Sequence, residues 1–190
     1  MFVDWRLKAA DRVIPDRRDI DPTEIPQLLP YILLSEIVPP FRVRYRLLGT
    51  EVVAVTGMDF AGCYLDELIP PGDEEAWVEN YRLCAESKRP VYGLSTVRTL
   101  SGGTFSYEFG IWPLTKGNAA VSQFIGIEDP RGRDRQGQAV GTGELVHLGQ
   151  RLVTQAPLWD VDDAFKGKVV RWLRNNAQIG ERIPDFLTFI

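Results

Sequence analysis

The sequence is poor in the residues that most often carry catalysis or bind metals. Its 190 residues include one histidine, His147, and two cysteines, Cys63 and Cys84, with no CxxC pair. A Ser-His-Asp or Cys-His arrangement would have to use His147, and this residue set has no zinc-ligand spacing. Two cysteines are also too few for a disulfide framework, so we expect buried, reduced thiols. We therefore expect no enzyme and no metal site.

Long apolar runs are absent as well. The N-terminus, MFVDWRLKAADR, lacks the apolar run of a signal peptide, and no stretch approaches the roughly 18 apolar residues of a membrane span. We therefore expect a cytoplasmic protein without a membrane partner. The net charge is −4, so nucleic-acid binding would need a local basic patch.

What is present suits an ordinary folded domain. Apolar residues make up 44% of the chain and charged residues 25%, close to the globular average. We assign residues 17–128 to one domain and residues 129–143, rich in Gly and charge, to a linker or flexible loop. Residues 144–190 form a C-terminal extension, in which His147 would lie beyond the sheet. There, an amphipathic helix from about Asp160 to Asn176 is predicted by the spacing of Val161, Phe165, Val169 and Trp172.

The hydrophobic pattern of the domain predicts an α+β fold. A helix should begin at Asp21-Pro22 and end near Leu29, and a longer one should run from Asp73 to Lys88 with Trp77, Tyr81 and Cys84 on one face. Strands are predicted at residues 31–38, 41–47, 91–100, 104–114 and 119–127. The first two strands form a hairpin, helices follow, and the last three strands form a meander. This order gives a five-stranded antiparallel sheet with helices on one face, and a C-terminal helical tail follows it.

Several motifs within this pattern resemble a PAS domain. The segment GMDFAGCYLDELIPPGD, residues 57–73, has two glycines five residues apart, an apolar turn, and then Pro and Asp opening a helix. RRDIDPTEIPQLLP and RYRLLGT are similar to motifs of a small PAS-like family common in alphaproteobacteria, in which "ID-P…P-x-LLP" precedes the first strand. The matching residues are Asp21, Pro22, Pro26, Leu28, Leu29, Pro30 and Arg44 to Thr50.

The resemblance covers residues 17–128 and implies a bacterial sensor that acts in signal transduction through a partner protein or as a dimer. It also implies a place for a ligand, between the helices and the inner face of the sheet. The candidate lining residues are Leu47, Val52, Val55, Phe60, Tyr64, Leu68, Trp77, Tyr81, Tyr107, Phe109 and Phe124. These side chains either fill a solid core or enclose a small, mostly apolar or aromatic ligand. Tyr64, Tyr81 and Tyr107 favour a pocket, because a buried phenol needs a polar partner.

Two cofactors of PAS proteins do not fit the sequence. Haem-binding PAS domains use an axial histidine on the helical side, and none precedes His147. Flavin-binding light sensors carry a reactive cysteine in an Asn-Cys-Arg-type motif, whereas Cys63 stands in Gly-Cys-Tyr. We therefore expect neither haem nor flavin, and no other cofactor is evident.

A row of arginines is the second candidate site. Arg42, Arg44 and Arg46 alternate with apolar residues along one predicted strand, and Arg98 joins them from another. Such a row repels itself unless it is solvated or countered. It is therefore either a solvated face or an interaction surface for an acidic partner or a second copy. The predicted helix carrying Val161, Phe165, Val169 and Trp172 would cover part of the sheet or complete a dimer.

These observations leave three functional hypotheses. The first is a non-catalytic sensory or protein-interaction module. The second is a small cone-shaped α+β enzyme of the dehydratase or isomerase type, which would need a His-Asp pair in its cavity. The third is nucleic-acid binding through the arginine face, which the acidic net charge disfavours.

Overall fold

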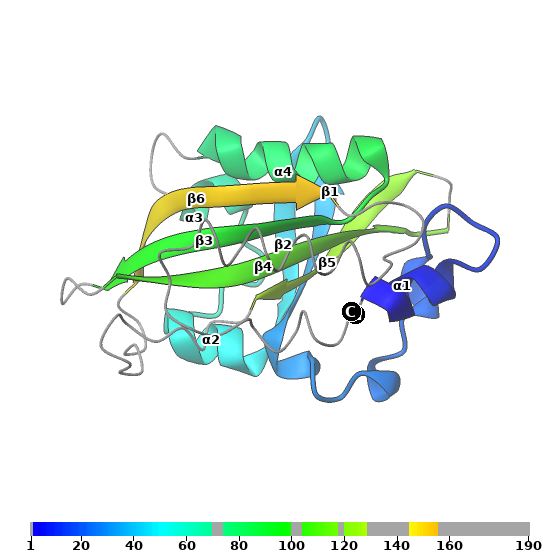
Figure 1. Ribbon diagram of the computed structural model, residues 1–190, viewed down its shortest axis with the longest axis horizontal. Coiled ribbons are helices and arrows are strands. Elements are labelled where there is room, and N and C mark those ends of the chain that lie inside the picture. The colour runs from blue at the N-terminus through cyan, green and yellow to red at the C-terminus, as the bar shows by residue number, and fades with distance from the viewer. Residues whose placement is uncertain (1, 70–73, 100–103, 118–119, 129–144, 156–190) are drawn as a thin grey trace, which may run out of the picture.

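An antiparallel sheet organises the chain (Figure 1). The computed structural model describes residues 2–69, 74–99, 104–117, 120–128 and 145–155. The strands, β1 (Ile32–Val38), β2 (Arg42–Leu48), β3 (Val91–Thr99), β4 (Thr104–Thr115), β5 (Val121–Glu128) and β6 (Leu145–Gln155), lie in the order β2-β1-β5-β4-β3-β6. The α+β class and the antiparallel sheet of β1 to β5 are as predicted.

Three helices between β2 and β3 pack on one face, here called the inner face. They are α2 (Thr50–Thr56), α3 (Leu65–Leu68) and α4 (Glu74–Ser87). Trp77, Tyr81 and Cys84 of α4 are buried on its predicted apolar side. They join inward-facing strand residues in one core that includes Val43, Tyr45, Phe109, Ile111 and Phe124.

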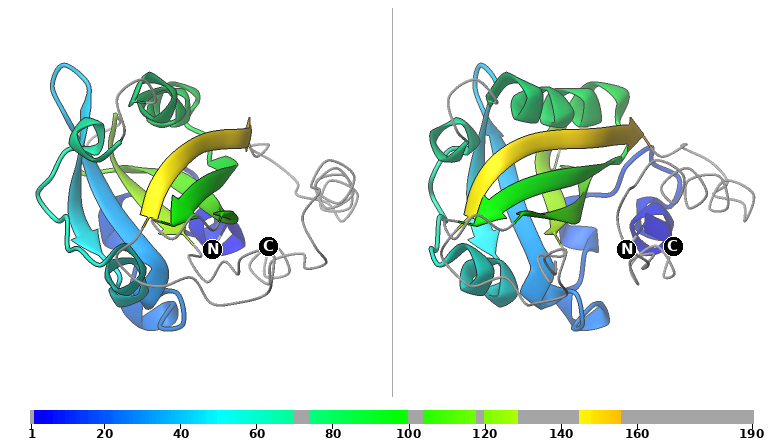
Figure 2. Two further views of the ribbon diagram at one scale, coloured as in Figure 1. Left: turned by 90° about the vertical axis from the view of Figure 1, so that its left-hand side faces the viewer. Right: turned by 60° about the vertical axis from the view of Figure 1, so that its left-hand side comes forward.

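The N-terminal segment packs on the opposite, outer face of the sheet (Figure 2). It contains α1 (Phe2–Ala9) and three short 3-10 helices, η1 (Arg17–Asp19), η2 (Pro22–Glu24) and η3 (Leu29–Tyr31). A second core results, made of Trp5, Ile14, Ile20, Ile25, Ile32, Trp112, Leu114, Ile125 and Ile127. This layer was not predicted from the sequence.

The expected α-helix from Asp21 to Leu29 is wrong. Asp21 does cap a helical turn, accepting a hydrogen bond from the Thr23 amide at 2.9 Å, but the turn is the 3-10 helix η2 and ends at Glu24. Pro26 has no N–H to donate, so an α-helix through this segment would lose a backbone hydrogen bond.

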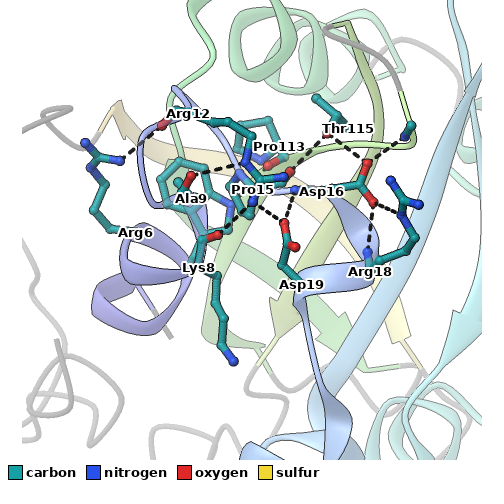
Figure 3. Close-up of polar contacts among 12 residues, drawn as sticks. Arg6, Lys8, Ala9, Arg12, Pro15, Asp16, Arg18, Asp19, Pro113 and Thr115 are labelled. Atoms are coloured by element: carbon teal, nitrogen blue, oxygen red, sulfur yellow. Dashed lines mark hydrogen bonds and ion pairs between the residues drawn. The ribbon is translucent and has the colours of Figure 1, made fainter.

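Asp16 fastens the N-terminal segment to the turn after β4 (Figure 3). Its buried carboxylate accepts hydrogen bonds from the Gly117 amide at 2.6 Å and from the backbone and side chain of Arg18, both at 3.0 Å. These bonds hold the pKa of Asp16 far below its usual range. Next to it, the Thr115 amide donates to the Pro15 carbonyl at 3.0 Å. The indole of Trp5 donates to the Pro113 carbonyl, also at 3.0 Å.

A sixth strand, β6, pairs with the edge of β3. The register sets Val97 opposite His147 and Val91 opposite Gln155. The expectation that His147 lies beyond the sheet is therefore wrong. Local sequence did not reveal the strand, because its pairing partner lies about 50 residues earlier in the chain. The predicted linker at 129–143 and the helix near 160–176 lie outside the described residues, so the proposed domain boundaries stay predictions.

An irregularity in β2 corrects the expected orientation of Leu47. Leu34 pairs with Leu47, but the next residue, Ser35, pairs with Tyr45, so Arg46 is an extra residue in the ladder. Such a bulge reverses the alternation of side chains. Leu47 is consequently 50% exposed, and Leu48 packs against the inner core in its place.

Candidate functional site

A group of polar side chains lies within the apolar inner core. Ser35 of β1, Tyr45 of β2, Tyr81 of α4 and Glu128 of β5 make up this group, here called the inner polar cluster. The hydroxyls of Tyr45 and Ser35 are hydrogen-bond partners of the Tyr81 hydroxyl. One phenol therefore links α4 to two adjacent strands.

Strand pairing and helical periodicity bring these residues together. Ser35 lies directly opposite Tyr45 on one side and Phe124 on the other. Tyr81 projects from the buried side of α4 and meets Phe124 edge-to-face, with ring centroids 5.0 Å apart. The phenol is thereby directed at the middle of the sheet, where Ser35 and Tyr45 stand.

Glu128 ends β5 on the same face. It pairs with Phe109 across the β4–β5 ladder and follows Phe124 at period-two spacing. Its carboxylate interacts electrostatically with Tyr45 and Tyr81. Among the described residues, no hydrogen bond or ion pair to this carboxylate is seen. Burial raises the pKa of Glu128 to about 7, because desolvation disfavours the charged carboxylate.

The phenols of the cluster remain protonated at physiological pH. Burial, the largest cause, raises the pKa of both Tyr45 and Tyr81 well above the ordinary value, and the nearby Glu128 carboxylate adds to this effect. Both residues can therefore donate a hydrogen bond, either to each other or to another acceptor.

Aromatic rings surround these polar groups. Trp77 and Phe109 have centroids 5.1 Å apart, and Tyr45 meets Phe60 edge-to-face at 4.9 Å. Val52, Phe60, Trp77, Tyr81, Phe109 and Phe124, all candidate lining residues, belong to the inner core, and Leu68 and Tyr107 pack against it. That they line a ligand site stays a prediction.

Other candidate residues lie elsewhere. Leu47 faces outward because of the β2 bulge. Tyr64 is half-buried near β2, with the Arg42 guanidinium 3.7 Å from its ring centroid. The side chain of Val55 is not among those that the structure describes.

Sequence reasoning missed Ser35, Tyr45 and Glu128 as site residues. Period-two counting already placed Tyr45 inward, and the same counting from Phe124 gives Gly126 and Glu128 on the inner face. The strand was predicted to end at residue 127, so Glu128 was not considered as a core residue. The period-two alternation therefore indicated an inward-facing Glu128, but a carboxylate at a strand end is usually solvated.

Carboxylates counter the arginine row. Arg42 donates to Asp66 at 2.7 and 3.2 Å and to Glu67 at 3.1 Å, while Arg44 and Arg46 both pair with Glu36. The side chain of Arg98 is outside the described set, as are Val161, Phe165, Val169 and Trp172. These ion pairs weaken the case for a phosphate-binding surface formed by Arg42, Arg44 and Arg46.

The edge of β2 that faces away from β1 is also covered. The Tyr45 amide donates to the Cys63 carbonyl at 3.0 Å, and the Gly62 amide donates to the Tyr45 carbonyl at 2.8 Å. Residues 60–64 therefore protect the edge on which the arginines lie.

The model of a family described as PAS domain matches residues 1–128, and the chain belongs to this family. The match includes the N-terminal segment on the outer face. The family and the fold define a sensory or interaction module, a class that is generally non-catalytic.

Solved structures with a similar fold show low sequence identity. One, from work on a flavin analogue and the mechanism of a light-oxygen-voltage domain, is 13% identical, with a TM-score of 0.45 and coverage of 82% of this chain and 94% of that one. A PAS domain from Colwellia psychrerythraea is 14% identical, with a TM-score of 0.43 and coverage of 56% and 93%. An RNA-binding light-oxygen-voltage receptor is 18% identical, with a TM-score of 0.41 and coverage of 57% and 32%. No curated protein matches the chain.

Among the described residues, no helix is both long and apolar enough to span a membrane. Within the same residues, no group of three or more His, Cys, Asp or Glu side chains is arranged to hold a metal ion.

Proposed function

We propose that this PAS domain binds a small, largely apolar or aromatic ligand at the inner polar cluster and passes the signal to a partner protein. The observation that carries the proposal is the desolvated Glu128 carboxylate beside Tyr45 and Tyr81 in an otherwise apolar core.

The alternative is that the inner aromatic residues form a solid core. Such a core gains most from apolar side chains, since a buried carboxylate without a partner is destabilising. Glu128 is half-buried and has no such partner among the described residues. A ligand that supplies hydrogen-bonding groups would offset this cost, and this favours a binding role.

The position of Tyr81 suggests how occupancy would be transmitted. Its hydroxyl connects α4 with β1 and β2 through Ser35 and Tyr45. A ligand that competes for these hydrogen bonds would change the contact between α4 and the sheet. A partner that contacts α4 could then distinguish the occupied from the empty state.

Native mass spectrometry of the freshly purified full chain tests ligand binding. We expect a retained small molecule, or a metabolite-dependent rise in melting temperature, in the native protein. Tyr81→Phe should reduce either signal, whereas Glu86→Gln, a change at an exposed carboxylate of the same helix, should leave it intact. If no molecule is retained and no metabolite raises the melting temperature, the core is solid and the proposal is wrong.

A further inference from the structure

An apolar groove lies between the C-terminal half of α4 and the β1–β2 hairpin. It has a volume of about 630 Å³, and within the part of the chain that the structure describes it is open on one side. Its apolar lining comes from the hairpin, from α4 and from the start of β5, and consists of Ile37, Phe41, Ala85, Ala120 and Val121. Covering such a surface is favourable, because apolar area is removed from water.

The side of α4 that borders this groove is acidic. Glu86 lines the groove, and Glu79 and Glu75 precede it on the same side of the helix at spacings of seven and four residues. All three glutamates are exposed. Arg82 is the one cation within this row, and it pairs with Glu79 at 3.2 Å. Lys88, just after the helix, gives the groove a positive charge at that end.

The described part of the chain ends close to this groove. Gln155, the last residue of β6, pairs with Val91, which follows Lys88 by three residues. The Cα atoms of Gln155 and Lys88 are therefore at most about 16 Å apart, because paired residues lie about 5 Å apart and three residues span about 10 Å. Residues 156–161 can span about 20 Å, which is enough to reach the groove. Since β6 runs in the same direction as α4 (Figure 1), a helix that turns back after Gln155 would be antiparallel to α4.

We propose that residues 161–173 of this chain form a helix antiparallel to α4 and occupy the groove. The face that enters it carries Val161, Phe165, Val169 and Trp172, which recur at intervals of four, four and three residues and so share one side of a helix. From Val161 to Trp172 this face extends over about 16 Å, within the roughly 20 Å length of α4. The inference does not depend on ligand binding at the inner polar cluster.

The charges of the segment match those beside the groove in this orientation. The residues at its start are acidic and would lie near Lys88; they are Asp160, Asp162 and Asp163. The later charged residues are basic and would lie along the glutamates of α4; they are Lys166, Lys168, Arg171 and Arg174. A parallel helix would set the aspartates beside the glutamates, and like charges at close range repel.

Hydrogen exchange of the full chain, read by mass spectrometry, tests the proposal. The amides of residues 161–173 should be protected in the native chain, because a docked helix opens rarely. Ala120→Arg fills the groove from an exposed position and should raise their exchange rates at least about tenfold. Ala61→Arg makes the same change at an exposed residue outside the groove lining and should leave these rates unchanged. Equal melting temperatures of the two variants would show that Ala120→Arg is folded.

Three results of this experiment would contradict the proposal. Fast exchange of residues 161–173 in the native chain would leave the groove for a separate partner. Protection that persists in Ala120→Arg would mean that the segment docks elsewhere, for instance on the sheet. Protection that is lost on dilution would mean that the segment occupies the groove of a second copy.

Phe165→Asp tests the same contact from the side of the segment. We expect faster exchange both in residues 161–173 and in residues 83–89, at the end of α4 that borders the groove. Gly167→Asp adds the same charge on the opposite side of the predicted helix and should behave like the native chain. If Phe165→Asp releases the segment but leaves residues 83–89 unchanged, the groove is not its docking site.

Discussion

The ring of Trp112 lies over Gly110, two residues earlier on β4. A Cβ atom placed on Gly110 would come within 2.4 Å of the Trp112 ring, far inside contact distance. Trp112 is 1% exposed and meets Tyr92 edge-to-face at 5.4 Å on the outer face of the sheet. The glycine is therefore what allows this indole to pack over its own strand at this position.

Gly110→Ala should accordingly destabilise the protein by about 1–3 kcal/mol, because the buried indole has little room to move. Urea unfolding followed by tryptophan fluorescence measures the change. Gly126→Ala on the adjacent strand is the control, since its Cβ would have 3.5 Å to the nearest atom, an ordinary contact. Equal losses in the two variants would contradict the role given to Trp112.

The Asp16 hydrogen bonds predict an acid-sensitive attachment of the N-terminal segment. Because the folded pKa of Asp16 is depressed, its contribution to stability is present above about pH 4, the unfolded value, and is lost as pH falls below it. Asp16→Asn should cost about 1–2 kcal/mol at pH 7, and the difference from the native chain should shrink towards pH 2. Denaturant unfolding across this pH range checks both statements. A difference independent of pH would show that the carboxylate charge is not responsible.

Tyr45 and Tyr81 should act on stability as a unit. Tyr81→Phe removes the hydroxyl that Ser35 and Tyr45 share and should cost about 1 kcal/mol. Tyr45→Phe should cost a similar amount, and the double variant should cost less than the sum, because both single changes remove the same hydrogen bond. Strict additivity in this double-mutant cycle would show that the two hydroxyls are not coupled.

Removal of β6 should change the association of the protein. A chain ending at residue 140 lacks β6 and leaves the long β3 edge with unpaired backbone groups. We expect it to self-associate in sedimentation velocity runs. A chain ending at residue 155, which keeps β6, is the control for loss of the remaining C-terminal residues. If both truncated chains sediment alike, β6 does not protect the β3 edge.

The sequence predicted the inner half of the domain well because its patterns are local. Alternation in FRVRYR and helical spacing of Trp77, Tyr81 and Cys84 follow directly from strand and helix geometry. The outer half depends on contacts between distant segments. Trp5 reaches Pro113, and Asp16 reaches Gly117, about 100 residues away in each case, and no local pattern encodes such contacts.

The sequence indicated most of the aromatic residues of the inner core but not the polar contacts among them. Aromatic core residues are recognisable from apolar periodicity, but the partners of a buried hydroxyl are not. The link between Tyr81, Ser35 and Tyr45 depends on strand register, and the register of β2 against β1 is shifted by the bulge at Arg46. Leu47 was misplaced for the same reason.

The covered edge of β2 also limits how copies of this chain could assemble through their sheets. Residues 60–64 already bond to the backbone of Tyr45, so a further strand cannot be added on that side without displacing them. A further strand could then be added only at the β6 side of the sheet. Two molecules joined through this side would each have used the sheet edge that was still available. Growth by strand addition would then stop at a closed pair instead of propagating into a fibre.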